Sequence, residues 1–241
     1  MLPRLAGRRG MRSHRPGASF PNSPTLVYNV AEEGADVMGQ IYVALDTETT
    51  GSNVERDTII EVGAVRFRED GETLDQWSSL INPGRPIPFS VAQLTGITSQ
   101  MVAGAPALRD VAEKLRRFIG DQSTIIVGHN IDFDLGFLRR GGIYLPHPFV
   151  DTFELAGILL PTQSRYSLER LAAHFGIPFP QRHRALDDAR ATRSLYLALM
   201  HYAETRVPLQ IIREINRLAA SSNWPLRFFF CLLYTSPSPR D

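Results

Sequence analysis

Three strand-like segments follow one another early in the chain, and their order limits the possible folds more than any other feature. Residues 41–45 form a short apolar run that is typical of a buried strand, and residues 59–68 and 74–81 have the pattern of two more strands. Asp70-Gly71, between the second and third segments, is typical of a hairpin turn. The pattern predicts an antiparallel meander of three strands.

Helical and strand-like segments alternate in the rest of the chain. Residues 106–119 have the spacing of an amphipathic helix, and residues 125–127 have that of a strand ended by Gly128. Asn130 is a typical helix cap, so the next helix is expected to run from there to the glycines at 141 and 142. The remaining predicted elements are a short strand near residues 149–150 and helices beginning at Thr152, Ser167 and Ala185. This order predicts an α/β fold in which a mixed sheet is flanked by helices.

Two acids, Asp46 and Glu48, come directly after the first strand-like run. Residues two apart on a strand face the same side, with Cα atoms about 6 to 7 Å apart. Two unneutralised carboxylates at that distance repel, so the pair favours a bound cation. The Thr49-Thr50-Gly51 turn that follows fits a substrate-binding rim better than the alternative, a solvated strand end.

Further acids lie at the starts of two predicted helices. Asp132 and Asp134 fall in the first turn after Asn130, where an acid is commonly only a partner of the helix dipole. His183 and Asp188 are five residues apart, so on one helix they would point about 140° apart, since each residue turns through roughly 100°. His183 must therefore lie in the loop before the helix if the two act together, and Asp187 and Asp188 cannot both face one site.

These motifs resemble those of the DnaQ-like, or DEDDh, 3′ to 5′ exonucleases over roughly residues 40 to 202. The similarity extends to the segments at 59–64, 82–84, 94–98, 166–168 and 183–192. It implies a ribonuclease H-like fold with a mixed five-stranded sheet. It also implies metal-binding acids and a general base, all present here: Asp46, Glu48, Asp134, Asp188 and His183. The resemblance selects Asp134 over Asp132 and Asp188 over Asp187.

The implied cofactor is a pair of Mg²⁺ or Mn²⁺ ions about 3.5 to 4 Å apart, which suit oxygen ligands. Asp46 is expected to bridge the pair, with Glu48 and Asp188 on the side of the attacking water and Asp134 on the side of the leaving group. His183 is expected to take the proton of the water. By family analogy, the terminal nucleotide is contacted by a further set of residues: Thr49, Gly51, Leu94, Thr95 and Asn130.

The predicted function is metal-dependent 3′ to 5′ exonucleolytic hydrolysis of DNA or RNA, which releases nucleoside monophosphates. The predicted partners are DNA or RNA 3′ ends. One alternative is an epsilon-like proofreading subunit of a DNA polymerase, and another is an RNA-trimming relative. A noncatalytic nucleic-acid-binding module would be expected to have lost one of the acids. An internally cutting ribonuclease H relative would lack both the Asp46-Thr-Glu48 motif and the spacing from His183 to Asp188.

Composition adds less than the motifs. At 241 residues with 43% hydrophobic content, one domain with a sizeable core is expected. No apolar run is long enough to span a membrane and the start lacks a signal-peptide core, which predicts a cytoplasmic protein. The net charge of +1 is too small to predict nucleic-acid binding. Four arginines around the third motif nevertheless predict phosphate contacts: Arg182, Arg184, Arg190 and Arg193.

Both ends of the chain differ from its middle. Residues 1–37 are rich in Arg, Pro and Gly, and this composition predicts either a mis-started extension or a disordered basic arm. The predicted exonuclease domain covers residues 38–204. The pattern of residues 205–230 predicts a helical connector to a missing C-terminal region. This segment resembles the connector found where such a domain precedes a DinG-type helicase. Residues 231–241 resemble one reading frame of a transposon-end sequencing adapter, which predicts an artefact foreign to the protein.

Overall fold

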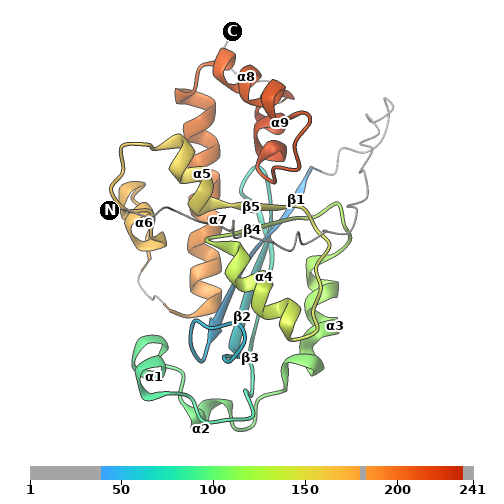
Figure 1. Cartoon of the computed structure of the whole chain (residues 1–241), viewed down its shortest axis with the longest axis vertical. Coiled ribbons are helices and arrows are strands. Elements are labelled where there is room, and N and C mark those ends of the chain that lie inside the picture. Colours follow the sequence, from blue (N-terminus) through green and yellow to red (C-terminus); the bar gives the residue numbers. More distant parts are fainter. Residues whose placement is uncertain (1–38, 180–182, 236–241) are drawn as a thin grey trace, which may run out of the picture. The chain divides into compact units, whose positions relative to one another are not determined.

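One mixed sheet of five strands forms the centre of the molecule (Figure 1). A computed structural model describes residues 39–179 and 183–235, so the predictions for residues 1–37 and for Arg182 lie outside the described residues. The strand order is β3-β2-β1-β4-β5. β1, β2 and β3 are antiparallel, whereas β4 and β5 run parallel to β1. The strands are β1 (Ile41–Thr49), β2 (Ile59–Arg68), β3 (Thr73–Leu80), β4 (Ile125–Gly128) and β5 (Phe149–Asp151). The predicted meander and mixed sheet are confirmed.

The helices begin close to their predicted positions. The one predicted at residues 106–119 starts at Leu108, and the one predicted at Ala185 starts there. The helices are α1 (Phe89–Thr95), α2 (Ser99–Val102), α3 (Leu108–Ile119), α4 (Ile131–Arg140), α5 (Thr152–Leu159), α6 (Leu168–His174), α7 (Ala185–Arg206), α8 (Leu209–Ala219) and α9 (Arg227–Thr235). Within the described ranges, no helix combines the length and the apolar character needed to cross a membrane.

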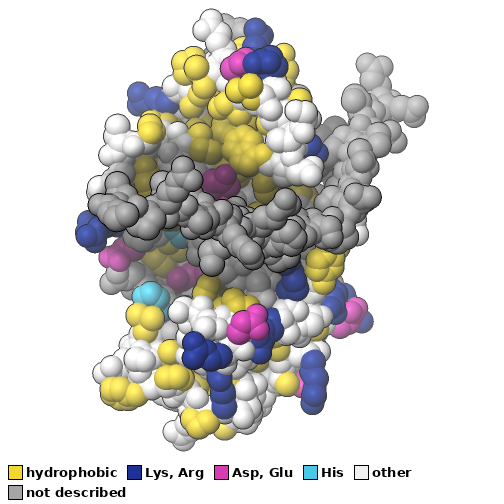
Figure 2. Space-filling view, viewed as in Figure 1, with side chains coloured by type: hydrophobic (Ala, Val, Ile, Leu, Met, Phe, Trp, Pro, Cys, Tyr) yellow, Lys and Arg dark blue, Asp and Glu magenta, His cyan; other side chains and the backbone are white. Residues whose placement is uncertain are grey.

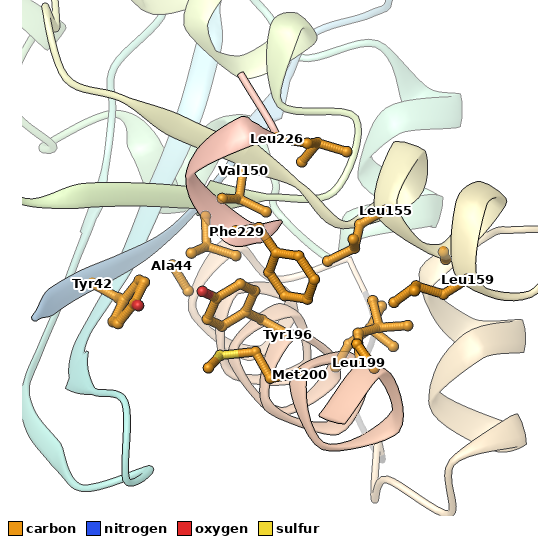
Figure 3. Close-up of a cluster of buried hydrophobic side chains, with 14 of the residues drawn as sticks. Tyr42, Ala44, Val150, Leu155, Leu159, Tyr196, Leu199, Met200, Leu226 and Phe229 are labelled. Atoms are coloured by element: carbon orange, nitrogen blue, oxygen red, sulfur yellow. The ribbon is translucent and has the colours of Figure 1, made fainter. Parts of the chain in front are cut away.

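Alternating side chains of β1 pack into two separate cores. Tyr42 and Ala44 join a buried cluster with residues of α5 and α7, including Tyr196 (Figure 3). Val43 and Leu45 face the other way and pack with α3 and α4. Because side chains alternate along a strand, the next even-numbered residues of β1 continue on the α7 face. The long helix α7 therefore covers the face toward which Asp46 and Glu48 point.

The C-terminal segment packs onto the α7 core. Ile212 of α8 and Phe229 and Phe230 of α9 are buried in the same cluster as Tyr196. Figure 3 shows Phe229 beside Tyr196. Trp224 stacks on Phe230 with ring centroids 5.6 Å apart. This burial explains why the segment predicted as a connector is folded against the domain. The predicted segment boundaries, including the helicase connector and the adapter-like end, stay predictions.

Candidate active site

Asp46 and Glu48 lie inside β1, which is longer than the predicted run of residues 41–45. The extension exists because Asp46 to Thr49 keep pairing with β2, where Asp46 faces Gly63 and Glu48 faces Glu61. Both acids are half-buried. They lie on the same side of the sheet, as their spacing predicted, and this is the side that α7 covers.

Asp134 joins them from the first turn of α4. Its side chain is 4% exposed, and its Oδ1 accepts hydrogen bonds from the Thr47 backbone N–H at 2.8 Å and the Thr47 hydroxyl at 2.7 Å. These bonds attach α4 directly to the acidic end of β1. Asp132, the other acid of this turn, is exposed. The structure thus brings in Asp134 and leaves Asp132 outside.

His183 and Asp188 reach the site from opposite sides of the start of α7. His183 lies in the loop before the helix, as predicted, and its backbone N–H donates to Asp188 Oδ1 at 3.1 Å. Glu48, His183 and Asp188 each offer one ligand atom, and these atoms lie within 4.8 Å of one another. Asp187 instead forms an ion pair with Arg190 at 2.8 Å.

A buried acid that sequence reasoning did not place in the site fixes α7 to the sheet. Glu61 of β2 is 2% exposed and holds Arg184 in a two-bond ion pair, with distances of 3.0 and 2.8 Å. Its Oε2 also accepts the backbone N–H of Ala185 at 3.0 Å. Beside it, a Cβ on Gly63 would overlap the backbone of Ala185 and Leu186. The sequence signal for this role was a lone acid inside an apolar strand.

The electrostatics of the four clustered acids favour a bound cation. Burial, and then the charges of Asp134 and Asp188, raise the pKa of Asp46 well above its usual range. Burial first, and then the charge of Asp188, raise the pKa of Glu48 to about 8. Burial likewise raises the pKa of Asp134 to about 7 and that of Asp188 to about 6. Such groups ionise readily only when positive charge is placed among them. The donor set therefore fits divalent cations with oxygen ligands.

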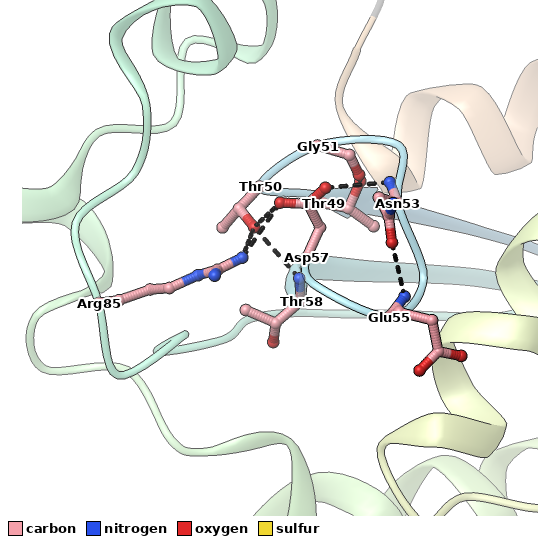
Figure 4. Close-up of polar contacts among 8 residues, drawn as sticks. All are labelled: Thr49, Thr50, Gly51, Asn53, Glu55, Asp57, Thr58 and Arg85. Carbon is pink, nitrogen blue, oxygen red and sulfur yellow. Dashed lines mark hydrogen bonds and ion pairs between the residues drawn. The ribbon is translucent and has the colours of Figure 1, made fainter.

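The loop after β1, residues 50–58, carries the predicted rim of the substrate site and is called here the rim loop (Figure 4). Thr49 donates its hydroxyl hydrogen to the Gly51 carbonyl at 2.6 Å. Asp57 accepts hydrogen bonds from Thr50 and from the Asn53 backbone N–H, and its carboxylate fills the space that a Cβ on Gly51 would need. The loop is therefore held in one shape by its own polar groups.

The other predicted substrate contacts differ in how accessible they are. Leu94 of α1 is 58% exposed, but Thr95 is 4% exposed. The Thr95 hydroxyl donates to Val91 O and accepts from Ile97 N, so it is engaged within the protein. Asn130 is exposed and has a positive φ of 63°. All three contacts stay predictions.

Asn130 stands at the N-cap position of α4, but its side chain does not cap the helix. Asp151, at the end of β5, takes that role, because its carboxylate accepts the backbone N–H groups of Asn130 at 2.9 Å and Ile131 at 3.2 Å. The same carboxylate accepts the N–H of Phe153 at 2.8 Å and caps α5. One acid therefore fixes the starts of two helices, including the one that carries Asp134.

Replacing Asp151 by alanine is expected to destabilise the protein by about 2 kcal/mol, because two helix starts lose their caps at once. Thermal or urea unfolding measures this change. Asp132→Ala is the matched control, since Asp132 is an exposed acid in the first turn of α4. Equal unfolding midpoints for the two variants would contradict the double-cap role.

Of the four arginines predicted to contact phosphate, the three that the structure describes already have partners within the protein. Arg184 is engaged with Glu61, and Arg190 bonds both Asp187 and Gln76. Arg193 donates to the Gly71 carbonyl and lies over the Phe67 ring. These guanidinium groups are therefore engaged by Glu61 of β2, Gln76 of β3, Asp187 of α7 and the turn between β2 and β3.

Comparison with known proteins identifies similar sequences. The family model described as Exonuclease (RNase_T) matches residues 43–196. The DNA polymerase III PolC-type of Clostridium perfringens is 39% identical over 199 residues, which cover 81% of this chain and 13% of that protein. The PolC-type polymerase of Bacillus subtilis is 36% identical over 204 residues, covering 82% and 14%. The chain thus spans about one seventh of the length of these curated relatives.

Solved structures with a similar fold are also nucleases. Exonuclease X in complex with 5′ overhanging duplex DNA superposes with a TM-score of 0.56 and 30% identity, covering 66% of this chain and 91% of that one. The nuclease domain of 3′hExo, a DEDDh family member bound to rAMP, gives a TM-score of 0.60 with 18% identity, covering 69% and 94%. The ribonuclease H-like architecture predicted from the motifs is confirmed.

Proposed function

The chain belongs to the exonuclease (RNase_T) family, of the DEDDh type, and from this premise we propose that it hydrolyses DNA from the 3′ end and releases nucleoside monophosphates. The observation that carries the proposal is the meeting of four acids and one histidine from three distant segments. β1 supplies Asp46 and Glu48, α4 supplies Asp134, and the start of α7 supplies Asp188 beside His183.

The proposed metal ligands are the four acids Asp46, Glu48, Asp134 and Asp188. Mg²⁺ or Mn²⁺ is the proposed metal, because the acids offer only oxygen atoms. When bound, divalent cations supply an activated water and neutralise the charge that develops on the phosphate. The protein's own contribution is to hold the carboxylates on one face in a fixed arrangement, through the Thr47 and Glu61 contacts.

His183 is the proposed general base. Its backbone is fixed by the bond to Asp188, and its imidazole lies with the carboxylates of Glu48 and Asp188. An imidazole can take the proton of an attacking water near neutral pH.

DNA is the proposed substrate because the curated relatives are DNA polymerases and Exonuclease X is described in complex with DNA. A proofreading role within a longer polymerase remains a second candidate, since the matching region of the relatives is a small part of each polymerase. We also propose that the protein is cytoplasmic. A noncatalytic module is disfavoured because all five predicted site residues are present.

The test is a cleavage assay on the full chain. We expect a 5′-labelled single-stranded DNA to give a ladder of 3′-shortened products with Mg²⁺, and none with EDTA. An RNA of the same sequence compares the two sugars, and Asp188→Ala controls for contaminating nucleases. Faster cleavage of RNA than DNA would overturn the proposed substrate. Absence of cleavage of both polymers with Mg²⁺ and with Mn²⁺ would overturn the activity.

A further inference from the structure

A pocket of about 320 Å³ lies against the rim loop, outside the cluster of acids. Its walls come from the rim loop, the segment before α1, and the facing ends of α3 and α4. Three guanidinium groups, those of Arg56, Arg85 and Arg140, line it against one carboxylate, that of Asp57. Figure 2 shows basic side chains on the lower part of this face, where Figure 1 draws the rim loop and the end of α4. The lining therefore carries an excess of positive charge.

The three arginines are engaged to different degrees. Arg85 has a structural role, since it donates to the Thr50 hydroxyl at 2.5 Å and to Asp57 at 3.1 Å (Figure 4). The Arg56 guanidinium makes no hydrogen bond or ion pair within the described part of the chain. Arg140 pairs with Glu55 at 2.9 Å, but the Glu55 side chain is 84% exposed. Exposed pairs of this kind contribute little stability, so an anion can replace Glu55 at small cost.

The inner wall of the pocket is apolar. Ile59, Leu108 and Phe137 contribute to its lining. Apolar walls lower the local dielectric constant and strengthen the attraction between a guanidinium and an anion. Planar guanidinium groups bind phosphate oxygens in pairs, which makes a phosphate the best-matched ligand. The C-terminal end of α4 repels an anion, because the helix dipole places about half a negative charge there. The two positive charges of Arg56 and Arg140 are larger than this.

The pocket lies along α4 from the acidic site. Asp134 is in the first turn of α4 and Arg140 is its last residue, six positions further on. At 1.5 Å per residue this is about 9 Å along the helix axis. A phosphate bound beside Arg140 would therefore lie away from the bond that is cut, further along the same strand.

We propose that Arg56 and Arg140 bind a backbone phosphate of the polynucleotide substrate, at a nucleotide that precedes the one being released. This proposal rests on the proposed function, because the ligand is the same strand whose 3′ end enters the acidic site. The pocket would then help to bind longer strands and would take no part in the hydrolysis at the acidic site. A dinucleotide has a single phosphodiester and cannot occupy both places.

The experiment measures equilibrium binding of the full chain to labelled single-stranded DNA of about 15 nucleotides, with Ca²⁺ in place of Mg²⁺. Arg56→Ala and Arg140→Ala are each expected to raise Kd about 3- to 10-fold. Arg139→Ala is the matched control, because Arg139 is the neighbouring exposed arginine of α4 and does not line the pocket. Glu55→Gln is expected to lower Kd, since it frees Arg140.

The salt dependence gives a second readout. Each lost phosphate contact is expected to reduce the slope of log Kd against log salt by about 0.7. In the cleavage assay, the two arginine variants are expected to raise KM for the long strand and leave the dinucleotide unaffected. Equal weakening by Arg139→Ala, or an equal loss with the dinucleotide, overturns the proposal. Because binding is measured without cleavage, an inactive wild-type chain would overturn the proposed function and leave this comparison intact.

Discussion

Replacing Asp46 by asparagine is expected to lower the rate of nucleotide release by about 10³-fold or more and, without metal, to raise the melting temperature at pH 8. Activity falls because the proposed bridging carboxylate loses its charge. Stability rises because burial, and then the charges of Asp134 and Asp188, disfavour the ionised form of Asp46 in the folded protein, whereas asparagine has no charge to bury. If Asp46 served stability alone, its replacement would lower the melting temperature instead.

The pH dependence of the metal-free protein follows from the same pKa shifts. The folded-state pKa of Glu48 is raised to about 8 and that of Asp134 to about 7, so the folded chain binds more protons than the unfolded chain between pH 4 and 8. Stability is therefore greatest at the acid end of this window and decreases as the pH rises through it. Added Mg²⁺ is expected to reverse much of the decrease at pH 8, because it binds only the folded site.

Calorimetry measures the melting temperature in EDTA and in Mg²⁺, at pH 5 and pH 8. The cleavage assay measures the activity of the same proteins. Asp46→Asn is expected to flatten the decrease between the two pH values and to weaken the response to Mg²⁺. Asp132→Asn serves as the control, since its exposed carboxylate lies in the same turn as Asp134 and should change neither quantity. An active Asp46→Asn protein would remove Asp46 from the proposed ligand set.

Replacing Glu61 by alanine is expected to destabilise the protein by about 2 to 4 kcal/mol and to lower kcat by at least about 10²-fold. The change leaves the Arg184 guanidinium and the Ala185 backbone N–H without their buried partner. Because these groups hold the loop and first turn that carry His183 and Asp188, the two would no longer be aligned with β1. Glu61 is therefore a positioning residue.

Two comparisons separate positioning from general loss of stability. Glu61→Gln keeps the shape and one acceptor oxygen, so it should recover much of the stability and part of kcat, with KM nearly unchanged. Glu214→Ala removes the acid of an exposed ion pair with Arg217 in α8 and should leave stability and rate unchanged. If Glu61→Ala, measured well below its melting temperature, keeps the wild-type kcat, the positioning role is wrong.

The elements and the acids were predictable because local patterns encode them. Strand alternation placed Asp46 and Glu48 on one face, and the angle between helical residues required His183 to precede α7. The supporting contacts were not predictable, because they join residues far apart in the chain. Glu61 bonds Ala185 at a separation of 124 residues, and Asp151 bonds Asn130 at a separation of 21.

The arginines near His183 also show that sequence alone does not reveal long-range contacts. Their closeness in sequence to His183 suggested phosphate binding, but Arg184 pairs with Glu61 and Arg190 bonds Gln76, both on distant strands. Arg190 also pairs with Asp187 of its own helix. Arg140, which sequence reasoning did not select, faces a pocket only because α4 brings it beside the rim loop. A local pattern identifies a charge, but only the fold shows whether that charge is available.

The alternation along β1 constrains how the chain can change length during evolution. Even-numbered positions carry the packing of Tyr42 and Ala44 and then the acids, and odd-numbered positions pack with α3 and α4. A single inserted or deleted residue before Asp46 would turn its carboxylate and that of Glu48 toward the opposite apolar core. Foldability and chemistry would then be lost together. Insertions and deletions should therefore be confined to the surface loops, while the length of β1 stays fixed.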